Sequence, residues 1–433
     1  MKYKWLFFVL LAVVFLSSCG GTSSLPSSSV ENCNELETER SASLTASPLI
    51  SDKRVSVYRN GLNRYFALSE SGIYCVAHEK NGTYALYCDK QSDQFVKLCN
   101  RVDCPHMDET CDAFLDDEST PTLGYYKEKL YYIKKGQLRT IKTGDGRESY
   151  ERIPAELWQM DQDGRNKLAV TFCWEKDDKI TGYGGLTFTD GYIEGMFKKV
   201  GENGTVEYSR RYTSLDHPGI FTETAGSKQL SFQDGSNGLV FGSDGGKIII
   251  QYVDQNNDQE SDNDGVHLKL YIWDPVENSI RYIGDRPFVS GYFAAETAFI
   301  VEEGVVKQWD YQTGTGTPLF DTGIRTKVSL SALPDCLAVC DIYEYQDLTD
   351  GVIPKVTIRF YDWNYAPLGE CELSFDKEMI RYGDYIFGET EDRILLVKDG
   401  SATRPDYYIE KSDFGTGTIT LHEYHYPEMD LPE

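Results

Sequence analysis

The sequence predicts an all-β fold: a single β-propeller of about seven four-stranded blades, with six or eight blades also compatible. Three observations predict it. The 30 Tyr and 20 Phe residues favour strands, because large rings pack well on a pleated surface. One short phrase recurs, in which an apolar or aromatic strand ends in Asp and a polar turn follows. Short strands between turn residues precede the copies of this phrase, without helical periodicity, as in propeller blades.

The recurring phrase places an Asp residue at the end of one strand in each predicted blade. Its copies end at Asp89, Asp161, Asp216, Asp274, Asp310, Asp362 and Asp413. The shortest interval, from Asp274 to Asp310, just accommodates four strands and three turns, so the longer intervals require insertions. The carboxylate of such an Asp can accept a hydrogen bond from a backbone N–H two residues on, which fixes the turn. A pair of β-sandwiches is the alternative, but sandwiches would not repeat one phrase along the whole chain.

Composition and charge restrict the class of protein. The 433 residues are 40% apolar, which is enough material for a sizeable core. Acidic residues number 69 against 43 basic ones, so the formal net charge is −26. A chain this negative is repelled by a phosphate backbone, and we therefore expect no nucleic-acid partner.

The first 18 residues have the features of an export signal. Lys2 and Lys4 are followed by an apolar run from Trp5 to Leu16, which is too short to cross a bilayer core of about 30 Å. The following Leu16-Ser17-Ser18-Cys19-Gly20 resembles the lipobox of bacterial lipoproteins. That resemblance implies cleavage before Cys19 and lipid attachment to it. An ordinary secretory signal with an incidental Cys is the alternative.

The remaining chain is expected to form a tether and one domain. Residues 19–50 contain the lipidated Cys and a Ser-rich and Thr-rich segment that reads as a flexible tether, and residues 51–427 form the propeller. No other stretch is long and apolar enough for a transmembrane helix. We expect the protein at the cell membrane or envelope, facing away from the cytoplasm, with its lipid as the contact to the membrane.

Two segments carry a family resemblance. Leu157–Gly164 (LWQMDQDG) and Leu98–Phe114, which contains several Cys residues, resemble a family of largely uncharacterised β-propeller lipoproteins from bacteria, related in form to TolB-like propellers. The resemblance covers most of residues 55–425. It implies a fold and a location, and it supplies no reaction.

Eleven Cys residues minus Cys19 leave an even number, which permits disulfides in an exported protein. Asn81-Gly82 is a strong hairpin signal, and a turn centred there would place Cys75 opposite Cys88. We therefore predict a Cys75–Cys88 disulfide, with two reduced thiols facing each other as the alternative. Buried, reduced thiols are expected at Cys173, Cys336, Cys340 and Cys371.

A second group of Cys residues predicts a metal site. Cys99, Cys104, His106 and Cys111 provide three thiols and one imidazole, the ligand set of a closed tetrahedral structural zinc site. The spacing is not that of a standard zinc finger. The competing interpretation is one disulfide within the loop, with the third thiol paired to a distant Cys such as Cys33; a loop with neither cross-link is the third possibility.

Motifs for catalysis are largely missing from the sequence. It contains no Gly-x-Ser-x-Gly, no Walker loop and no His-Glu-x-x-His. The acidic segment 254–265 offers oxygen ligands at alternate positions, as calcium requires, but a solvated insertion between two strands is the favoured interpretation.

We predict a monomeric binding or scaffold module for an unidentified glycan, peptide or protein. The sequence favours a binding protein over an enzyme. Propellers gather loops from all blades around one channel mouth, which suits recognition. One alternative is an enzyme acting on extracellular polysaccharide, with carboxylates in the central funnel. Another is a sensor or accessory subunit of an envelope complex.

Overall fold

The computed structural model describes residues 66–429 except 117–121, 143–147, 177, 179, 190, 202, 226–238, 245–246, 256–265, 287–290, 294–297, 325–326, 343–354, 375–384 and 399–403. The described residues all belong to the second of the two units into which the chain divides, Ile50–Glu433. The predicted signal and tether, Cys19, Cys33 and most of the acidic segment lie outside the described residues. In the described part of the chain, no helix is long and apolar enough to cross a membrane.

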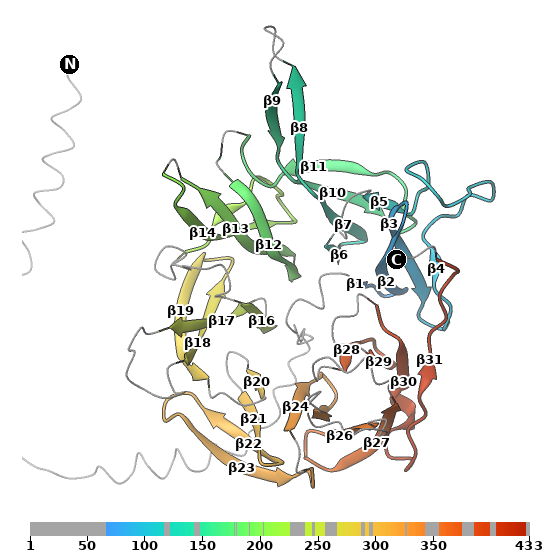
Figure 1. The fold of residues 1–433 in the computed structure, drawn as a ribbon. Coiled ribbons are helices and arrows are strands. Elements are labelled where there is room, and N and C mark those ends of the chain that lie inside the picture. The colour runs from blue at the N-terminus through green and yellow to red at the C-terminus, as the bar shows by residue number, and fades with distance from the viewer. Residues whose placement is uncertain are drawn as a thin grey trace, which may run out of the picture. The chain divides into compact units, whose positions relative to one another are not determined.

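The second unit is a seven-bladed β-propeller, which confirms the predicted fold class (Figure 1). Each blade is one antiparallel sheet whose strands come from a contiguous stretch of chain. The strands of blades 1 to 3 are β1 (Phe66–Leu68), β2 (Gly72–Glu79), β3 (Gly82–Asp89), β4 (Val96–Lys97) and β5 (Phe114–Asp116); β6 (Leu123–Tyr126), β7 (Lys129–Lys134), β10 (Glu156–Asp161) and β11 (Leu168–Phe172); and β12 (Ile180–Thr189), β13 (Tyr192–Val200), β14 (Val206–Ser214) and β15 (Thr222–Glu223).

Blades 4 to 7 follow the same order. Their strands are β16 (Leu239–Asp244), β17 (Lys247–Gln255), β18 (Val266–Asp274) and β19 (Ser279–Arg286); β20 (Gly291–Phe293), β21 (Ala298–Glu302), β22 (Val305–Asp310) and β23 (Thr315–Asp321); β24 (Lys327–Ala332), β25 (Leu337–Ile342), β26 (Lys355–Tyr361) and β27 (Pro367–Ser374); and β28 (Ile386–Glu389), β29 (Arg393–Leu396), β30 (Tyr407–Glu410) and β31 (His422–Glu423). A short 3-10 helix, η3 (Lys411–Asp413), follows β30. A two-stranded hairpin, β8 (Gln137–Lys142) and β9 (Glu148–Ile153), projects from blade 2 (Figure 1).

The ring closes where blade 7 meets blade 1. The backbone N–H of Phe95 donates to the carbonyl of His425 at 2.8 Å, and Gln94 forms a parallel bridge with the same residue. Arg393 of β29 donates to the carbonyl of Ser92 at 2.6 Å. An apolar cluster drawn from both blades fills the space between the sheets, so the two ends of the ring are joined by packing as well as by hydrogen bonds.

Each recurrent Asp residue either ends the third strand of its blade or follows that strand by no more than three residues. Four of them accept a hydrogen bond from the backbone N–H two residues on, as predicted: Asp89 from Gln91 (2.9 Å), Asp274 from Val276 (3.0 Å), Asp310 from Gln312 (2.7 Å) and Asp362 from Asn364 (2.8 Å). Asp413 instead accepts from the N–H of Thr420 at 2.8 Å, while Asp161 and Asp216 contact lysines. The phrase therefore marks one place in every blade and fixes the predicted turn in most of them.

The predicted register of the first hairpin is wrong. β2 and β3 pair Glu79 with Gly82, so the turn consists of Lys80 and Asn81. Gly82 has a φ of +133°, and a Cβ there would lie 2.4 Å from the ring of Phe114. Its lack of a side chain thus allows β5 to approach β3, and Gly82 is the first residue of a strand instead of the second residue of a turn.

This shift of two residues removes the basis for the Cys75–Cys88 disulfide. Cys75 lies opposite Leu86, and Cys88 lies opposite Ile73. Both are free, buried thiols in the apolar cluster between blades 1 and 7, and burial raises the pKa of Cys88 to about 12. The four other Cys residues expected in the core are also buried: Cys173, Cys336, Cys340 and Cys371.

The Asp turns should contribute measurably to stability. Asp362 accepts two backbone hydrogen bonds, from Asn364 and Ala366, both at 2.8 Å. Asp362→Ala is expected to lower the free energy of unfolding by about 1–2 kcal/mol, measured by chemical denaturation. Asp362→Asn keeps an acceptor oxygen and should lose less. Glu391→Ala, at an exposed position between β28 and β29, is the control, and an equal loss in this variant would contradict the role of the turn.

Candidate metal centre

The loop between β4 and β5 brings together all four residues of the predicted metal site. The ligand atoms of Cys99, Cys104, His106 and Cys111 all lie within 4.8 Å of one another, and Nδ1 of His106 is 3.4 Å from Sγ of Cys111. In a tetrahedron with bonds of about 2.0–2.3 Å, neighbouring ligand atoms lie about 3.5–3.8 Å apart. The cluster therefore has the composition and approximate size to hold one metal ion. The three thiols are free in the structure, without the disulfide of the competing interpretation.

Local turns bring the four ligands to one point. The N–H of Cys104 donates to the carbonyl of Arg101, and the N–H of Cys111 donates to that of Asp108, so each Cys ends a tight turn. Asp108 itself accepts from the N–H and hydroxyl of Thr110, at 2.9 and 2.6 Å. His106 has a φ of +56°, a left-handed conformation that is unfavourable for a side chain with a Cβ. We attribute this conformation to the turn that directs the imidazole toward Cys111.

The cluster lies between solvent and the core. Cys111 and Cys104 are 1% and 8% exposed, whereas Cys99 and His106 are partly exposed. Burial raises the pKa of Cys111 to about 12. Burial also acts to raise the pKa of Cys99, but hydrogen bonds from backbone N–H groups and the neighbouring thiols lower it overall. Several thiolates can share such a site when a cation neutralises them, as a divalent metal does.

Two lysines hold the loop from outside the ligand set, and neither was found by sequence reasoning. Nζ of Lys167 donates to the carbonyls of Phe114 (2.6 Å) and Cys111 (3.3 Å), and burial lowers the pKa of Lys167 to about 8. Nζ of Lys97 donates to the carbonyl of His106 at 3.0 Å. Lys97 lies two residues before the first ligand, but Lys167 comes from blade 2, and no sequence spacing indicates that contact.

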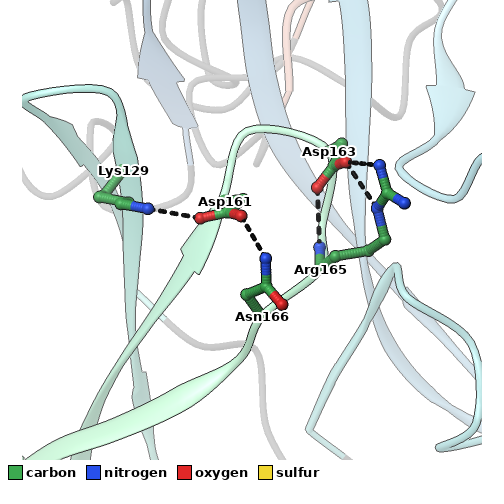
Figure 2. Close-up of polar contacts among 5 residues, drawn as sticks. All are labelled: Lys129, Asp161, Asp163, Arg165 and Asn166. Atoms are coloured by element: carbon green, nitrogen blue, oxygen red, sulfur yellow. Dashed lines mark hydrogen bonds and ion pairs between the residues drawn. The ribbon is translucent and has the colours of Figure 1, made fainter.

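The turn after β10 supports the loop from the side of blade 2. Figure 2 shows that Asp161 accepts from Lys129 (2.5 Å) and Asn166 (2.6 Å), while Asp163 accepts from the backbone and guanidinium of Arg165. The hydrogen bond from Lys129 lowers the pKa of the Asp161 carboxyl. These bonds fix the turn, which also contains Gly164.

Gly164, in the same turn, lies directly against the loop that connects β4 and β5, residues 98–113, which we call the metal loop. It has a φ of +83°, and a Cβ there would lie 2.5 Å from the carbonyl oxygen of Leu98 and 2.8 Å from that of Asp112. Only glycine permits this approach of two backbones. The metal loop of blade 1 and the Asp turn of blade 2 therefore form one packed unit.

Comparison with known proteins finds solved structures that share the propeller fold at low sequence identity. No protein family matches the sequence, and no characterised protein matches it at a significant level. The β-propeller domain of the Trilobed protease from Pyrococcus furiosus is 10% identical, with a TM-score of 0.38, covering 87% of this chain and 100% of that chain. TolB from Acinetobacter baumannii is 12% identical, with a TM-score of 0.31, covering 70% and 63%.

A puromycin-hydrolysing peptidase from Mycobacterium tuberculosis is 9% identical, with a TM-score of 0.43, covering 86% of this chain and 55% of that chain. These likenesses extend no further than the propeller fold. The function of this chain has to be inferred from its own residues.

The contact between Gly164 and the metal loop can be tested by substitution. Gly164→Ala adds both left-handed strain and a clash with two carbonyl oxygens, and we expect the free energy of unfolding to fall by about 3 kcal/mol or more. Gly314→Ala is the matched control, because its φ is +64° and a Cβ there would meet no atom within 4 Å. Strain alone should cost the control roughly 1 kcal/mol. Equal losses in chemical denaturation would show that the approach of the two backbones is unimportant.

Proposed function

We propose that the protein is a lipid-anchored, extracytoplasmic β-propeller that acts as a binding or scaffold module and carries one structural zinc ion in blade 1. The observation that carries this proposal is the position of the Cys99–Cys111 cluster. Its four ligand atoms converge within one loop of blade 1 that packs against Gly164 of blade 2, so a bound ion would order the surface on which these two blades meet. A rigid ring is what a propeller needs in order to present its loops to a partner.

The ligand set favours zinc with a structural role. Three thiolates and one imidazole suit a borderline-soft ion such as Zn²⁺, and magnesium and calcium prefer oxygen ligands. Four protein ligands complete the tetrahedron and leave no position for a water molecule or a substrate. A dication with three thiolates and a neutral imidazole carries a net charge of −1, and the ammonium of Lys167, bonded to the carbonyl of Cys111, supplies a compensating charge.

The N-terminal sequence supports anchoring at a membrane. The basic start, the apolar run and Cys19 together have the pattern of a lipoprotein signal. A body with an excess of acidic residues is repelled by anionic headgroups, so the lipid would have to provide the attachment. The polysaccharide-active enzyme and the accessory or sensor subunit stay predictions, since no contact in the described residues favours either of them.

Metal analysis tests the zinc centre. The purified mature protein should contain one zinc ion per chain, measured by elemental analysis, and Cys104→Ser/Cys111→Ser should contain none. Cys173→Ala, which changes a buried thiol of another cluster, should retain the metal. Wild-type protein without zinc, with two thiols of the loop resistant to titration until reduced, would instead support the disulfide interpretation.

Fractionation tests the anchor. Cys19→Ser removes the acceptor of the lipid, and this variant should move from the membrane fraction to the soluble fraction. Substitution of Cys33 by Ser is the matched control and should leave the protein on the membrane. Retention of the Cys19 variant on membranes would show that something other than lipid holds the protein.

A further inference from the structure

The ion pair between Glu79 and Lys97 lies beside the metal loop and is nearly closed to solvent. Glu79 ends β2 and Lys97 ends β4, two strands that pair with opposite edges of β3. Their side chains are only 7% and 12% exposed. A buried ion pair often adds no stability over apolar residues of the same volume, because both charges lose their hydration. Stability alone therefore does not account for a pair at this position.

The contacts of Lys97 lead to one of the metal ligands. Its Nζ lies 2.8 and 2.9 Å from the two carboxylate oxygens of Glu79 and donates to the carbonyl of His106 at 3.0 Å. The same ammonium lies 4.3 Å from the centre of the ring of Tyr84, a fully buried residue of β3. The carboxylate and the ring hold the ammonium from two sides, so the carbonyl of His106 is bonded to a group whose position is fixed.

His106 is the ligand that most needs such support. Of the four ligands, only His106 has a positive φ, and a residue with a Cβ keeps this left-handed conformation only where neighbouring contacts hold it. His106 is also partly exposed, whereas Cys104 and Cys111 are buried in the core. A rotation of the backbone at His106 would carry the imidazole, whose Nδ1 lies 3.4 Å from Sγ of Cys111, away from the three thiols. The bond from Lys97 opposes this rotation.

We propose that the Glu79–Lys97 pair positions His106 and thereby makes the imidazole, in place of a water molecule, the fourth ligand of the zinc ion. The pair stands outside the ligand set and acts through the backbone carbonyl of His106. With the imidazole held, four protein ligands close the site, as in structural zinc centres, whereas three thiolates alone would leave one position open. Groups that orient a metal ligand from outside the ligand set typically contribute about 10- to 100-fold to metal affinity.

The test removes both charges of the pair together. Lys97→Met/Glu79→Gln leaves no unpaired charge in the interior and keeps the net charge of the site unchanged, so a loss of zinc binding reports on position. The zinc affinity of the full chain purified in detergent, measured by competition with a chelator, should fall by about 10- to 100-fold. X-ray absorption at the zinc edge should show three sulfur ligands in the wild type and in the variant, but the scattering of a bound imidazole only in the wild type.

Two further variants separate positioning from general damage. Lys411→Met/Glu389→Gln is the matched control, because this ion pair of blade 7 is 2.9 Å long, has side chains 12% and 14% exposed, and contributes no ligand to the cluster. It should bind zinc like the wild type. His106→Ala should lose at least as much zinc affinity as the Glu79–Lys97 variant, and combining the two should cause no further loss, since both act on one ligand.

Unchanged zinc affinity in the Glu79–Lys97 variant, a retained imidazole, additive losses with His106→Ala, or an equal loss in the blade 7 control would each overturn the inference and leave the zinc centre in place. If circular dichroism shows that the variant does not fold, Glu79→Gln alone replaces it, because it removes the charge and keeps an acceptor for Lys97. The inference rests on the proposed zinc centre, and a wild type that binds no zinc would overturn both.

Discussion

Ring closure is the constraint on which the rest of this structure depends. A blade has two faces, and each face is buried only when a neighbouring blade lies against it. Six of the contacts between blades follow from the order of the chain, but the contact between blades 7 and 1 joins segments that are far apart in sequence. There the rings of Phe66 and Phe387 lie 4.4 Å apart, and Arg393 reaches the carbonyl of Ser92. Without this contact, both terminal blades would expose an apolar face.

Blade 1 takes part in this closing contact, and its outer part departs from the four-stranded pattern of the other blades. Its fourth strand, β4, has only two residues, and a fifth strand, β5, pairs with β3 beside it. The metal loop connects these two short strands. A loop with so few apolar residues has little core of its own, and a bound ion together with the contacts of Gly164 and Lys167 would give it order. The candidate metal centre thus lies where the regular pattern of the blades is weakest.

The repeated features of the chain could be predicted from the sequence, and the contacts between blades could not. Asp362 and its equivalents act through atoms only a few residues away, so their spacing reveals both the turn and the number of blades. The four metal ligands are likewise close in sequence. Lys167 and Gly164 act on a loop of another blade, and that neighbourhood exists only after the ring has formed. The prediction of the register between β2 and β3 failed for a related reason within blade 1: Gly82 accommodates the ring of Phe114, which comes from a strand more than 30 residues later in the chain.

The β8–β9 hairpin is an addition to blade 2 and no part of its sheet. β7 and β10, which flank it, pair directly from Lys134–Glu156 to Lys129–Asp161, so every ladder contact of the blade is made without the hairpin. Evolution can therefore lengthen, shorten or delete this segment while the ring keeps its geometry. The ring of blades and the hairpin are thus structurally separable: the geometry of the ring is set without the hairpin, and changes in the hairpin need not disturb it.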